Sequence, residues 1–327
     1  MTTAYPLIFD TILKDKVWGG RRLADFGKTL PPALNIGESW ELADMAATSA
    51  SGGGGGSAVS TIVNGPLAGR TIREASALWG SDLLGRAVLS PSGGFPLLVK
   101  FLDAREDLSV QVHPSPAYAA GHPDAHLKTE CWYILAAAPG AVLYKGVKPG
   151  VTREAFADHI RSNQVVGDMI AVPAVVGECH NLPSGTCHAL GAGVLVAEIQ
   201  TPSDTTFRVY DWGRSGRELH VRQALECIDF GPAPAPARVP TGAPRGRLVT
   251  TEFFLVDGLH LPARGVAPLG FGARPTVVMM LEGGGELHTA GAVTPLRAGQ
   301  TALVPACLAE AATLRGESRL GALLACV

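Results

Sequence analysis

The stretch LSVQVHP, residues 108–114, alternates apolar and polar side chains. On a β-strand successive side chains point to opposite faces, so Leu108 and the two valines would share one face, and Ser109, Gln111 and His113 the other. A solvated face more often carries Lys, Glu or Thr, whereas a Gln and a His two residues apart can hold one ligand together. The pattern therefore predicts a binding face on this strand.

Two further motifs carry side chains that can bind a metal. Glu130 opens a predicted strand in HLKTECWYIL, and GECHNLPSGTCHALGAG contains the spacing GxxxxxPxGxxH, which runs from Gly177 to His188. This spacing resembles the second motif of the cupins, in which the Pro and Gly form a tight turn and the His points into a small β-barrel. The first cupin motif supplies HxH followed by Glu, and QVH with Glu130 would correspond to it, with Gln111 in place of the first His.

These side chains form a mixed nitrogen and oxygen ligand set of two imidazoles, one carboxylate and one amide oxygen. Such a set suits Zn²⁺, and Mn²⁺, Fe²⁺ or Co²⁺ would also be accommodated. We expect one divalent metal per chain, with Zn²⁺ as the first choice. The expected ligands are Gln111, His113, Glu130 and His188.

The motifs together are more specific than a cupin in general. LSVQVHP, KTECWYIL, PSGTCHALG and EIQTPSDTTFRVYDWGR, with VWGGRRL, IGESWEL and FPLLVKFLDA before the metal motif, resemble the type I mannose-6-phosphate isomerases in their short bacterial form. The resemblance runs in order over about residues 5–230. It implies a zinc-dependent aldose-ketose isomerase of carbohydrate metabolism that interconverts mannose 6-phosphate and fructose 6-phosphate.

The resemblance also implies roles for residues outside the ligand set. Arg208 and Lys128 would be catalytic, and Lys100, Glu198 and Asp204 would bind substrate. Proton transfer between C2 and C1 of an open-chain sugar passes through an enediolate and needs a base and an electrophile, and a metal can stabilise the developing negative charge. Arg208 and the lysines would supply positive charge for the phosphate. The sequence leaves open which residue moves the proton.

Taken singly, several of these residues also allow a structural interpretation. Arg208 could form a surface ion pair with Asp204 or Asp211, and Lys100 could extend its ammonium group to the surface. The sequence context FRVYDW favours a functional role for Arg208.

Other chemically capable side chains are predicted to be structural. His122 and His180 are expected at the surface or in loops, with His180 as the replacement ligand if one of the four is wrong. Trp18, Trp40 and Trp132 are expected in the core rather than stacked on a sugar.

Two other functions remain open. A metal-dependent cupin oxygenase would use the same barrel with iron, but its ligand set is usually richer in His and it has no need of Arg208 and two lysines. A non-catalytic sugar-binding cupin is the second alternative. The residues after 246 have a cupin-like strand rhythm, and His288 there lacks partners for a metal.

These side chains must be positioned by short strands. The runs PLLVKFL, SVQVH, CWYILA, MIAVPA, VLVAEIQ and TFRVYDW predict strands before residue 231, and TEFFLVDGLHL, PTVVMMLEGGGELHT and GQTALVPA predict strands after 246. Helices are expected to begin at Thr71, whose spacing to Glu74 is that of a capping box, and at Thr152. The expected fold is mainly β: a cupin, which is a double-stranded β-helix or jelly-roll barrel, with a few inserted helices and a second, smaller cupin-like domain.

Two stretches interrupt this pattern. GPAPAPARVPTGAPRG, residues 231–246, is Pro-rich and predicts a semi-rigid linker. It would separate a catalytic metal-binding domain, 1–230, with a helical insertion at about 65–90, from a C-terminal domain without metal, 247–327. SGGGGGS, residues 51–57, predicts a mobile surface loop, and no GK[ST] follows it, which excludes a P-loop.

Composition limits the class of protein. The 327 residues are 46% hydrophobic and 17% charged with a net charge of -2, which supports buried cores and offers no basic stripe for nucleic acid. No stretch approaches the length of a membrane span, and the N-terminus lacks a signal-peptide pattern. The six cysteines form no CxxC pair, so we expect reduced thiols in a cytoplasmic protein, either a monomer or a homodimer.

Overall fold

The computed structural model describes residues 3–45 and 57–327. Except for Ser57, the glycine-rich stretch that was predicted as a loop lies outside the described residues. All strand pairings in the described part of the chain are antiparallel, and most strands belong to four sheets. The prediction of a mainly β fold is confirmed.

Two sheets carry the candidate site. The helix-covered sheet has five strands in the order β10 (Met169–Pro173), β9 (Val142–Val147), β12 (His188–Leu190), β7 (Val110–Val112) and β14 (Phe207–Tyr210). The central sheet has six, in the order β11 (Cys179–Leu182), β8 (Glu130–Ala137), β13 (Val194–Gln200), β6 (Leu98–Ala104), β2 (Ile12–Gly20) and β3 (Ile36–Leu42).

Two more sheets contain the C-terminal strands. The C-terminal inner sheet has the order β1 (Leu7–Ile8), β21 (Thr301–Val304), β18 (Thr276–Glu282), β23 (Leu320–Cys326), β16 (Leu255–Leu261) and β15 (Arg245–Thr250). The C-terminal outer sheet has the order β17 (Val266–Pro268), β22 (Thr313–Gly316), β19 (Gly284–Thr289) and β20 (Ala292–Arg297). A small separate pair joins β4 (Asp44–Met45) to β5 (Ala58–Val59).

Helices are short and lie outside the sheets. The α-helices are α1 (Ile72–Trp79), α2 (Ser81–Leu84), α3 (Pro116–Gly121), α4 (Arg153–Arg161), α5 (Val221–Cys227) and α6 (Ala306–Ala309). Three 3₁₀ helices are η1 (Arg22–Phe26), η2 (Gly65–Leu67) and η3 (Val165–Asp168). Within the described ranges, none of the helices has the length and apolar content to cross a bilayer.

Both helix starts named from the sequence are confirmed. At the start of α1 the Thr71 hydroxyl accepts a hydrogen bond from the Glu74 backbone N–H, and the Glu74 carboxylate accepts one from the Thr71 N–H, which forms the capping box. At the start of α4 the Thr152 hydroxyl accepts a hydrogen bond from the Ala155 N–H.

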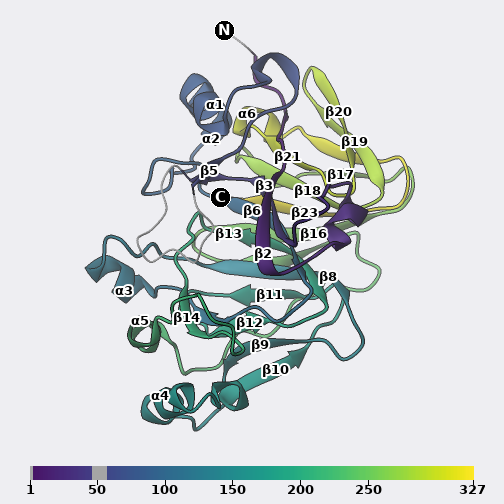
Figure 1. Ribbon diagram of the computed structural model, residues 1–327. Helices are drawn as coiled ribbons and strands as arrows, with labels where there is room; N and C mark the ends of the chain where they lie inside the picture. The colour runs from purple at the N-terminus through teal and green to yellow at the C-terminus, as the bar shows by residue number, and fades with distance from the viewer. Residues whose placement is uncertain (1–2, 46–56) are drawn as a thin grey trace.

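Clusters of buried side chains show how the four sheets stack. One cluster fills the barrel between the helix-covered and central sheets. A large one joins the other face of the central sheet to the C-terminal inner sheet, and a third fills the space between the two C-terminal sheets. In Figure 1 the C-terminal strands β16 to β23 occupy the upper part and the helix-covered sheet the lower part. The central sheet is therefore buried on both faces.

Strand alternation explains which side chains enter the first barrel. Val110 and Val112 on β7, and Phe207 and Val209 on β14, pack under α4 and α5 on the outer face of the helix-covered sheet. The residues between them must point the opposite way, into the barrel. For β14 that residue is Arg208, and for β7 it is Gln111.

Two details differ from the sequence expectation. Leu108 lies before β7 and packs with the barrel cluster instead of sharing a face with Val110 and Val112. The strand predicted from residue 251 begins only at Leu255, because the Thr251 hydroxyl accepts hydrogen bonds from the N–H groups of Phe253 and Phe254 and closes a turn.

Candidate metal centre and active site

Most of the candidate residues belong to two cross-strand rows inside the first barrel. The row in the helix-covered sheet crosses β12, β7 and β14 and consists of His188, Gln111 and Arg208. The row in the central sheet crosses β8, β13, β6 and β3 and consists of Trp132, Glu198, Lys100 and Trp40. Register partners on neighbouring strands present their side chains on the same face of a sheet. Each row therefore presents its polar groups together.

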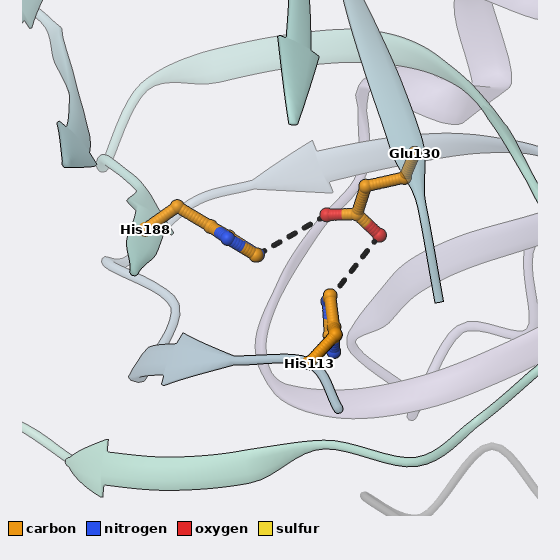
Figure 2. Close-up of side chains that lie close together, drawn as sticks. All are labelled: His113, Glu130 and His188. Carbon is orange, nitrogen blue, oxygen red and sulfur yellow. Dashed lines mark ion pairs between the residues drawn. The ribbon is translucent and has the colours of Figure 1, made fainter. Parts of the chain in front are cut away.

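Three of the four predicted ligands meet at one point. His113 Nε2 lies 3.5 Å from Glu130 Oε2, and His188 Nε2 lies 3.1 Å from Glu130 Oε1. Figure 2 shows the two rings and the carboxylate directed at one another. The ligand atoms of all three lie within 4.8 Å of one another, and the three residues are buried.

Three atoms of this cluster that form no hydrogen bond in the described part of the chain fit a metal ion. His113 Nε2 and both carboxylate oxygens of Glu130 are buried and make no hydrogen bond of acceptable geometry within the described chain. Buried polar atoms without a partner are costly, and an ion between them would satisfy all three. The two rings also bind backbone carbonyls through Nδ1, since His113 Nδ1 lies 2.9 Å from Thr205 O and His188 Nδ1 2.8 Å from Thr186 O. These contacts place the Nδ1 protons there and leave both Nε2 atoms able to bind a metal.

Gln111 lies beside this cluster. Its Nε2 is 3.3 Å from His188 Nε2, and its Oε1 is 3.5 Å from the Ser109 hydroxyl. Rotation of the amide by 180° exchanges its oxygen and nitrogen, which would bring the oxygen to the side of His188. Gln111 is thus close enough to act as the fourth ligand that the sequence predicts.

The electrostatics hold the cluster in its metal-binding protonation state. Burial, together with the Lys128 ammonium, lowers the pKa of His113 to about 3, so the ring is neutral at pH 7. Burial by itself would raise the pKa of Glu130, but Lys128 and the His113 ring outweigh it and hold this pKa well below its usual range. The Lys128 Nζ lies 2.7 Å from Glu130 Oε2. Glu130 is therefore a carboxylate and His113 a neutral imidazole, as a divalent cation requires.

A pocket opens next to the metal cluster and is positively charged. Gln111, Lys128 and Trp132 form part of its wall. Its basic residues are Lys16, Lys100, Lys128, Arg208 and Arg217, and its acidic residues are Glu38, Glu198 and Asp204. The wall thus has a formal charge of two positive units in a chain whose net charge is -2. An anionic small molecule is the ligand that this charge favours.

The central-sheet row forms a fixed polar wall. Lys100 Nζ lies 2.8 Å from Glu198 Oε1 and donates to Gln200 Oε1 at 2.7 Å. The Trp132 indole N–H donates to Glu198 Oε2 at 2.7 Å. Burial alone would lower the pKa of Lys100, but Glu198 and Glu38 outweigh it and raise it above its usual value. Lys100 is buried and paired, so the alternative in which it reaches the surface is wrong.

Arg208 is also buried, with 5% of the residue exposed. Its Nη1 donates to the Glu218 carbonyl at 2.8 Å, while its Nε is buried without a hydrogen-bond partner in the described chain. Burial, and next the nearby Arg217, lower the pKa of Arg208. The surface ion pair considered from the sequence is therefore wrong, and a buried guanidinium with an unused N–H lies at the pocket.

The sequence of this chain is similar to those of known proteins. A model of the catalytic domain of type I phosphomannose isomerases matches residues 7–136. Mannose-6-phosphate isomerase ManA of Bacillus subtilis is 34% identical over 320 residues, which cover 94% of this chain and 95% of the relative. The chain belongs to the type I phosphomannose isomerases. The mannose-6-phosphate isomerase of Streptococcus mutans serotype c is 36% identical over 266 residues, 77% of this chain and 78% of the relative.

A solved structure extends the likeness to the whole type I fold. The crystal structure of the mannose 6-phosphate isomerase from Bacillus subtilis matches with a TM-score of 0.83 and 29% identity, over 98% of this chain and 99% of that one. The predicted cupin fold is thereby confirmed. His188 and Arg208 lie beyond the 7–136 match, and the full-length relative and structure extend the likeness to that region.

Several pocket residues of this type I chain were not singled out from the sequence. Lys16, Glu38 and Arg217 line the pocket, and Trp40 does so although it is also buried. Glu38 accepts a hydrogen bond from the Trp40 indole N–H at 2.6 Å and lies 3.1 Å from Lys16 Nζ. The alternation in IGESWEL, which places Glu38 and Trp40 on one face of β3, was the signal that could have revealed them.

The expectation for His180 was wrong. His180 lies on β11 opposite Trp132, with 0% exposed, and is outside the cluster of potential ligands. Burial, and next the Lys145 ammonium, lower the pKa of His180 to about 4, so the buried ring is neutral. His180 was expected at the surface or in a loop, but its segment, Cys179–Leu182, pairs with β8 and forms the strand β11. His122, in contrast, is exposed at the end of α3 as predicted.

Proposed function

We propose that this chain is a zinc-dependent mannose-6-phosphate isomerase that interconverts mannose 6-phosphate and fructose 6-phosphate. The observation that carries the proposal is the buried cluster of His113, Glu130 and His188 beside a positively charged pocket, in which His113 Nε2 and both Glu130 oxygens form no hydrogen bond within the described chain. Membership of the type I family supports the substrate and the reaction. The reaction moves a proton between C2 and C1 of the open-chain sugar through an enediolate.

The zinc ion would be held by four ligands: Gln111, His113, Glu130 and His188. When bound, a divalent metal stabilises negative charge on the sugar oxygens at C1 and C2 without any redox change. The supporting observations are the unpaired Nε2 and carboxylate atoms and the neutral state of His113. An iron-dependent cupin oxygenase has less support, because its oxygen chemistry does not require a pocket with a net positive wall.

Arg208 and Lys128 are the proposed catalytic residues. The buried Nε–H of Arg208 has no protein acceptor within the described chain and can donate to an oxygen of the substrate that gains negative charge. The Lys128 ammonium, 2.7 Å from Glu130, supplies positive charge between the ligand carboxylate and the pocket. In a buried site both interactions are stronger than in water and are already oriented before the reaction.

Substrate hydroxyl groups would bind to Lys100, Glu198 and Asp204. Lys100 and Glu198 are held by their mutual ion pair and by Gln200 and Trp132, so their positions are fixed before the sugar enters. All three residues line the pocket. Fixed polar partners of both signs suit a polyhydroxylated ligand, because each hydroxyl both donates and accepts.

Turnover of mannose 6-phosphate before and after chelation tests this function. We expect fructose 6-phosphate to form, activity to disappear when the metal is removed by a chelator, and zinc to restore it. Formation of fructose 6-phosphate at an unchanged rate by metal-free protein would contradict the metal dependence. Oxygen consumption with iron-loaded protein and no isomerisation would favour the oxygenase instead.

We further propose a cytoplasmic location. The six cysteines are unpaired in the structure, which agrees with a reducing compartment. Cell fractionation with an antibody against the chain tests the location, and light scattering of the purified protein distinguishes a monomer from a homodimer.

A further inference from the structure

The loop after β14 brings a second arginine to the pocket that Arg208 lines. Arg217 lies in this loop, and both residues form part of the pocket wall. Its side chain is 26% exposed, whereas Arg208 as a whole is 5% exposed. Arg208 therefore lies in the interior of the site and Arg217 closer to solvent.

A buried carboxylate fixes the position of Arg217. Its Nε donates to Asp211 Oδ2 at 2.8 Å, and its Nη2 donates to Asp211 Oδ1. Asp211 is 4% exposed and also accepts from Arg214 Nη2 at 3.0 Å. Arg214 Nη2 in turn donates to the Asp107 carbonyl at 2.7 Å, which ties the loop to the segment before β7. Asp211 thus holds the edge of the Arg217 guanidinium that Nε and Nη2 form. The Nη1 of Arg217 makes no hydrogen bond within the described chain.

The three lysines of the pocket are more completely neutralised than Arg217. Lys128 pairs with Glu130, Lys100 pairs with Glu198, and Lys16 lies 3.1 Å from Glu38 Oε1. Asp211, by contrast, is shared between Arg217 and Arg214, so two guanidinium groups face one carboxylate. The excess positive charge of the pocket is therefore concentrated at Arg208 and Arg217.

This position matches the chemistry of a sugar 6-phosphate. The reacting carbons C1 and C2 belong next to the metal ligands, and the phosphate on C6 is at the opposite end of the open chain. A phosphate dianion with three oxygens is bound best by guanidinium groups, whose planar N–H donors can contact two oxygens at once. Arg217 lies closer to solvent than Arg208 and has an unused Nη1, so it is the donor that could do this at the phosphate end.

We propose that Arg217 binds the phosphate group and determines the preference for a phosphorylated over an unphosphorylated sugar, while Arg208 acts at the reacting end. This inference rests on the proposed isomerase function. Asp211 is the positioning residue, and Arg217 makes the contact.

The test is the kinetics of Arg217→Gln in the zinc-loaded enzyme. Loss of a charge-assisted contact to the phosphate raises KM for mannose 6-phosphate by about 10- to 100-fold and leaves kcat nearly unchanged. We expect inorganic phosphate to inhibit the wild type competitively and to be a correspondingly weaker inhibitor of Arg217→Gln. Whatever turnover the wild type has with unphosphorylated mannose should stay the same in the variant, because that sugar has no phosphate for Arg217 to contact.

Arg214→Gln is the matched control. Arg214 binds the same Asp211 from the same loop but does not line the pocket. We expect a lower melting temperature and a KM close to that of the wild type. If KM rose equally in Arg214→Gln and Arg217→Gln, the cause would be a general disturbance of the loop, and that result would overturn the inference.

The outcomes separate this inference from the proposed function. If the wild type isomerises mannose 6-phosphate and Arg217→Gln has the same KM and the same phosphate inhibition, Arg217 does not bind the phosphate. If the wild type does not isomerise mannose 6-phosphate, the proposed function fails, and calorimetric titration of inorganic phosphate into wild type and Arg217→Gln then decides the inference alone. If Arg217→Gln is unstable, Arg217→Lys replaces it, and an unchanged ratio of kcat/KM for mannose 6-phosphate over mannose would reject the role.

Discussion

His113 and His188 each bind a backbone carbonyl through Nδ1, and this contact decides what the other nitrogen can do. The carbonyls of Thr205 and Thr186 accept these protons and leave Nε2 of both rings as acceptors next to Glu130. A histidine without such a partner can change its tautomer, and metal affinity falls accordingly. Backbone carbonyls, which the residue types of the ligand motif do not specify, therefore prepare the site for a metal.

The ligand assignment predicts a graded loss of metal. His188→Ala removes an imidazole from a buried three-residue cluster, and we expect the variant to lose most of its zinc on dialysis and its turnover with it. Gln111→Ala should retain more zinc, because a neutral amide is the weakest ligand of the four. Elemental analysis of dialysed protein measures both. Full zinc content in His188→Ala would show that this histidine is not a ligand.

Arg208 predicts a loss of rate without loss of metal. Arg208→Lys keeps the charge but removes the buried Nε–H and the planar fork, so we expect turnover to fall by about two to three orders of magnitude. Zinc content and melting temperature should stay close to those of the wild type. Near-normal turnover in this variant would exclude a catalytic role for Arg208.

Glu38 predicts a dependence of stability on pH. Burial would raise the pKa of Glu38, but Lys16, Lys100 and the Trp40 N–H lower it from 4.5 to about 2. A carboxyl with a lower pKa in the folded state stabilises the fold above about pH 4.5 and loses that contribution as the pH falls toward 2. Between these values the free energy of unfolding should fall more steeply in the wild type than in Glu38→Gln, by up to about 3 kcal/mol. Chemical denaturation of the metal-free proteins measures this, and equal slopes would contradict it.

At the scale of elements, local signals were predictable and long-range register was not. The strand around Gln111, the strand around Arg208 and the capped helix at Thr71 follow from alternation and capping within a few residues. That His188 pairs with Gln111 depends on segments 77 residues apart, which no local pattern encodes. The predicted ligands could be named because the motif resembles a family. The polar side chains around Lys100 could be grouped only once the register between strands was known, and the sequence does not show that register.

The errors have the same physical origin. Leu108 would share a face with Val110 only if the strand extended that far, and the strand begins at Val110. His180 was expected at the surface or in a loop, but pairing with β8 makes its segment a buried strand. In both cases pairing with a strand distant in sequence determined which residues belong to the strand, and local composition alone could not predict this.

The cap of α1 gives a prediction for a single element. Thr71→Ala removes the hydroxyl that accepts from the Glu74 N–H and donates to the Glu74 carboxylate, and we expect a loss of about 1 kcal/mol in the free energy of unfolding. Turnover and zinc content should not change, because the buried residues of α1 pack in the cluster outside the first barrel. Thr71→Ser keeps the hydroxyl and is the control. Denaturation with urea measures the difference, and equal stability of the Ala and Ser variants would contradict the prediction.

At the scale of the molecule, the central sheet joins the two halves. We propose that residues 1–230 form the catalytic unit, with a helical insertion at about 65–90, that 231–246 is a linker, and that 247–327 is a metal-free unit supporting the central sheet. Lys28 connects the halves, since its ammonium lies 2.6 Å from Glu41 Oε2 on β3 and donates to the Gly299 carbonyl at 2.6 Å. Ser39 donates to the same carboxylate. These polar contacts lie on the face of β3 opposite to Glu38 and Trp40.

The connection at Lys28 predicts a large loss of stability that a second change reverses. Lys28→Met leaves the buried Glu41 without a counter-charge, and we expect a loss of about 3 to 5 kcal/mol in the free energy of unfolding. Lys28→Met combined with Glu41→Gln should recover most of this loss. Denaturation of the single and double variants measures it, and equal stability of the two would contradict the buried ion pair.

A residue of the C-terminal outer sheet tests whether the unit 247–327 only supports the central sheet. His288 lies 2.8 Å from Glu286 Oε2, and no cluster of potential metal ligands includes it in the described chain. His288→Ala should leave turnover intact. A large loss of turnover at unchanged stability would show that the C-terminal unit takes part in the reaction.

The pairing of β1 with β21 has a consequence for synthesis on the ribosome. Leu7 pairs with Leu303 and Ile8 with Ala302, so β1 finds its neighbour only after the residues up to the end of β21 at Val304 have been made. At about 5 to 20 residues per second, this delay is roughly 15 to 60 s. During that time the outer face of the central sheet, which the C-terminal inner sheet later covers, has no partner within the nascent chain. We therefore expect this apolar face to be the surface that chaperones recognise during translation, and the closing of β1 onto β21 to be among the last steps of folding.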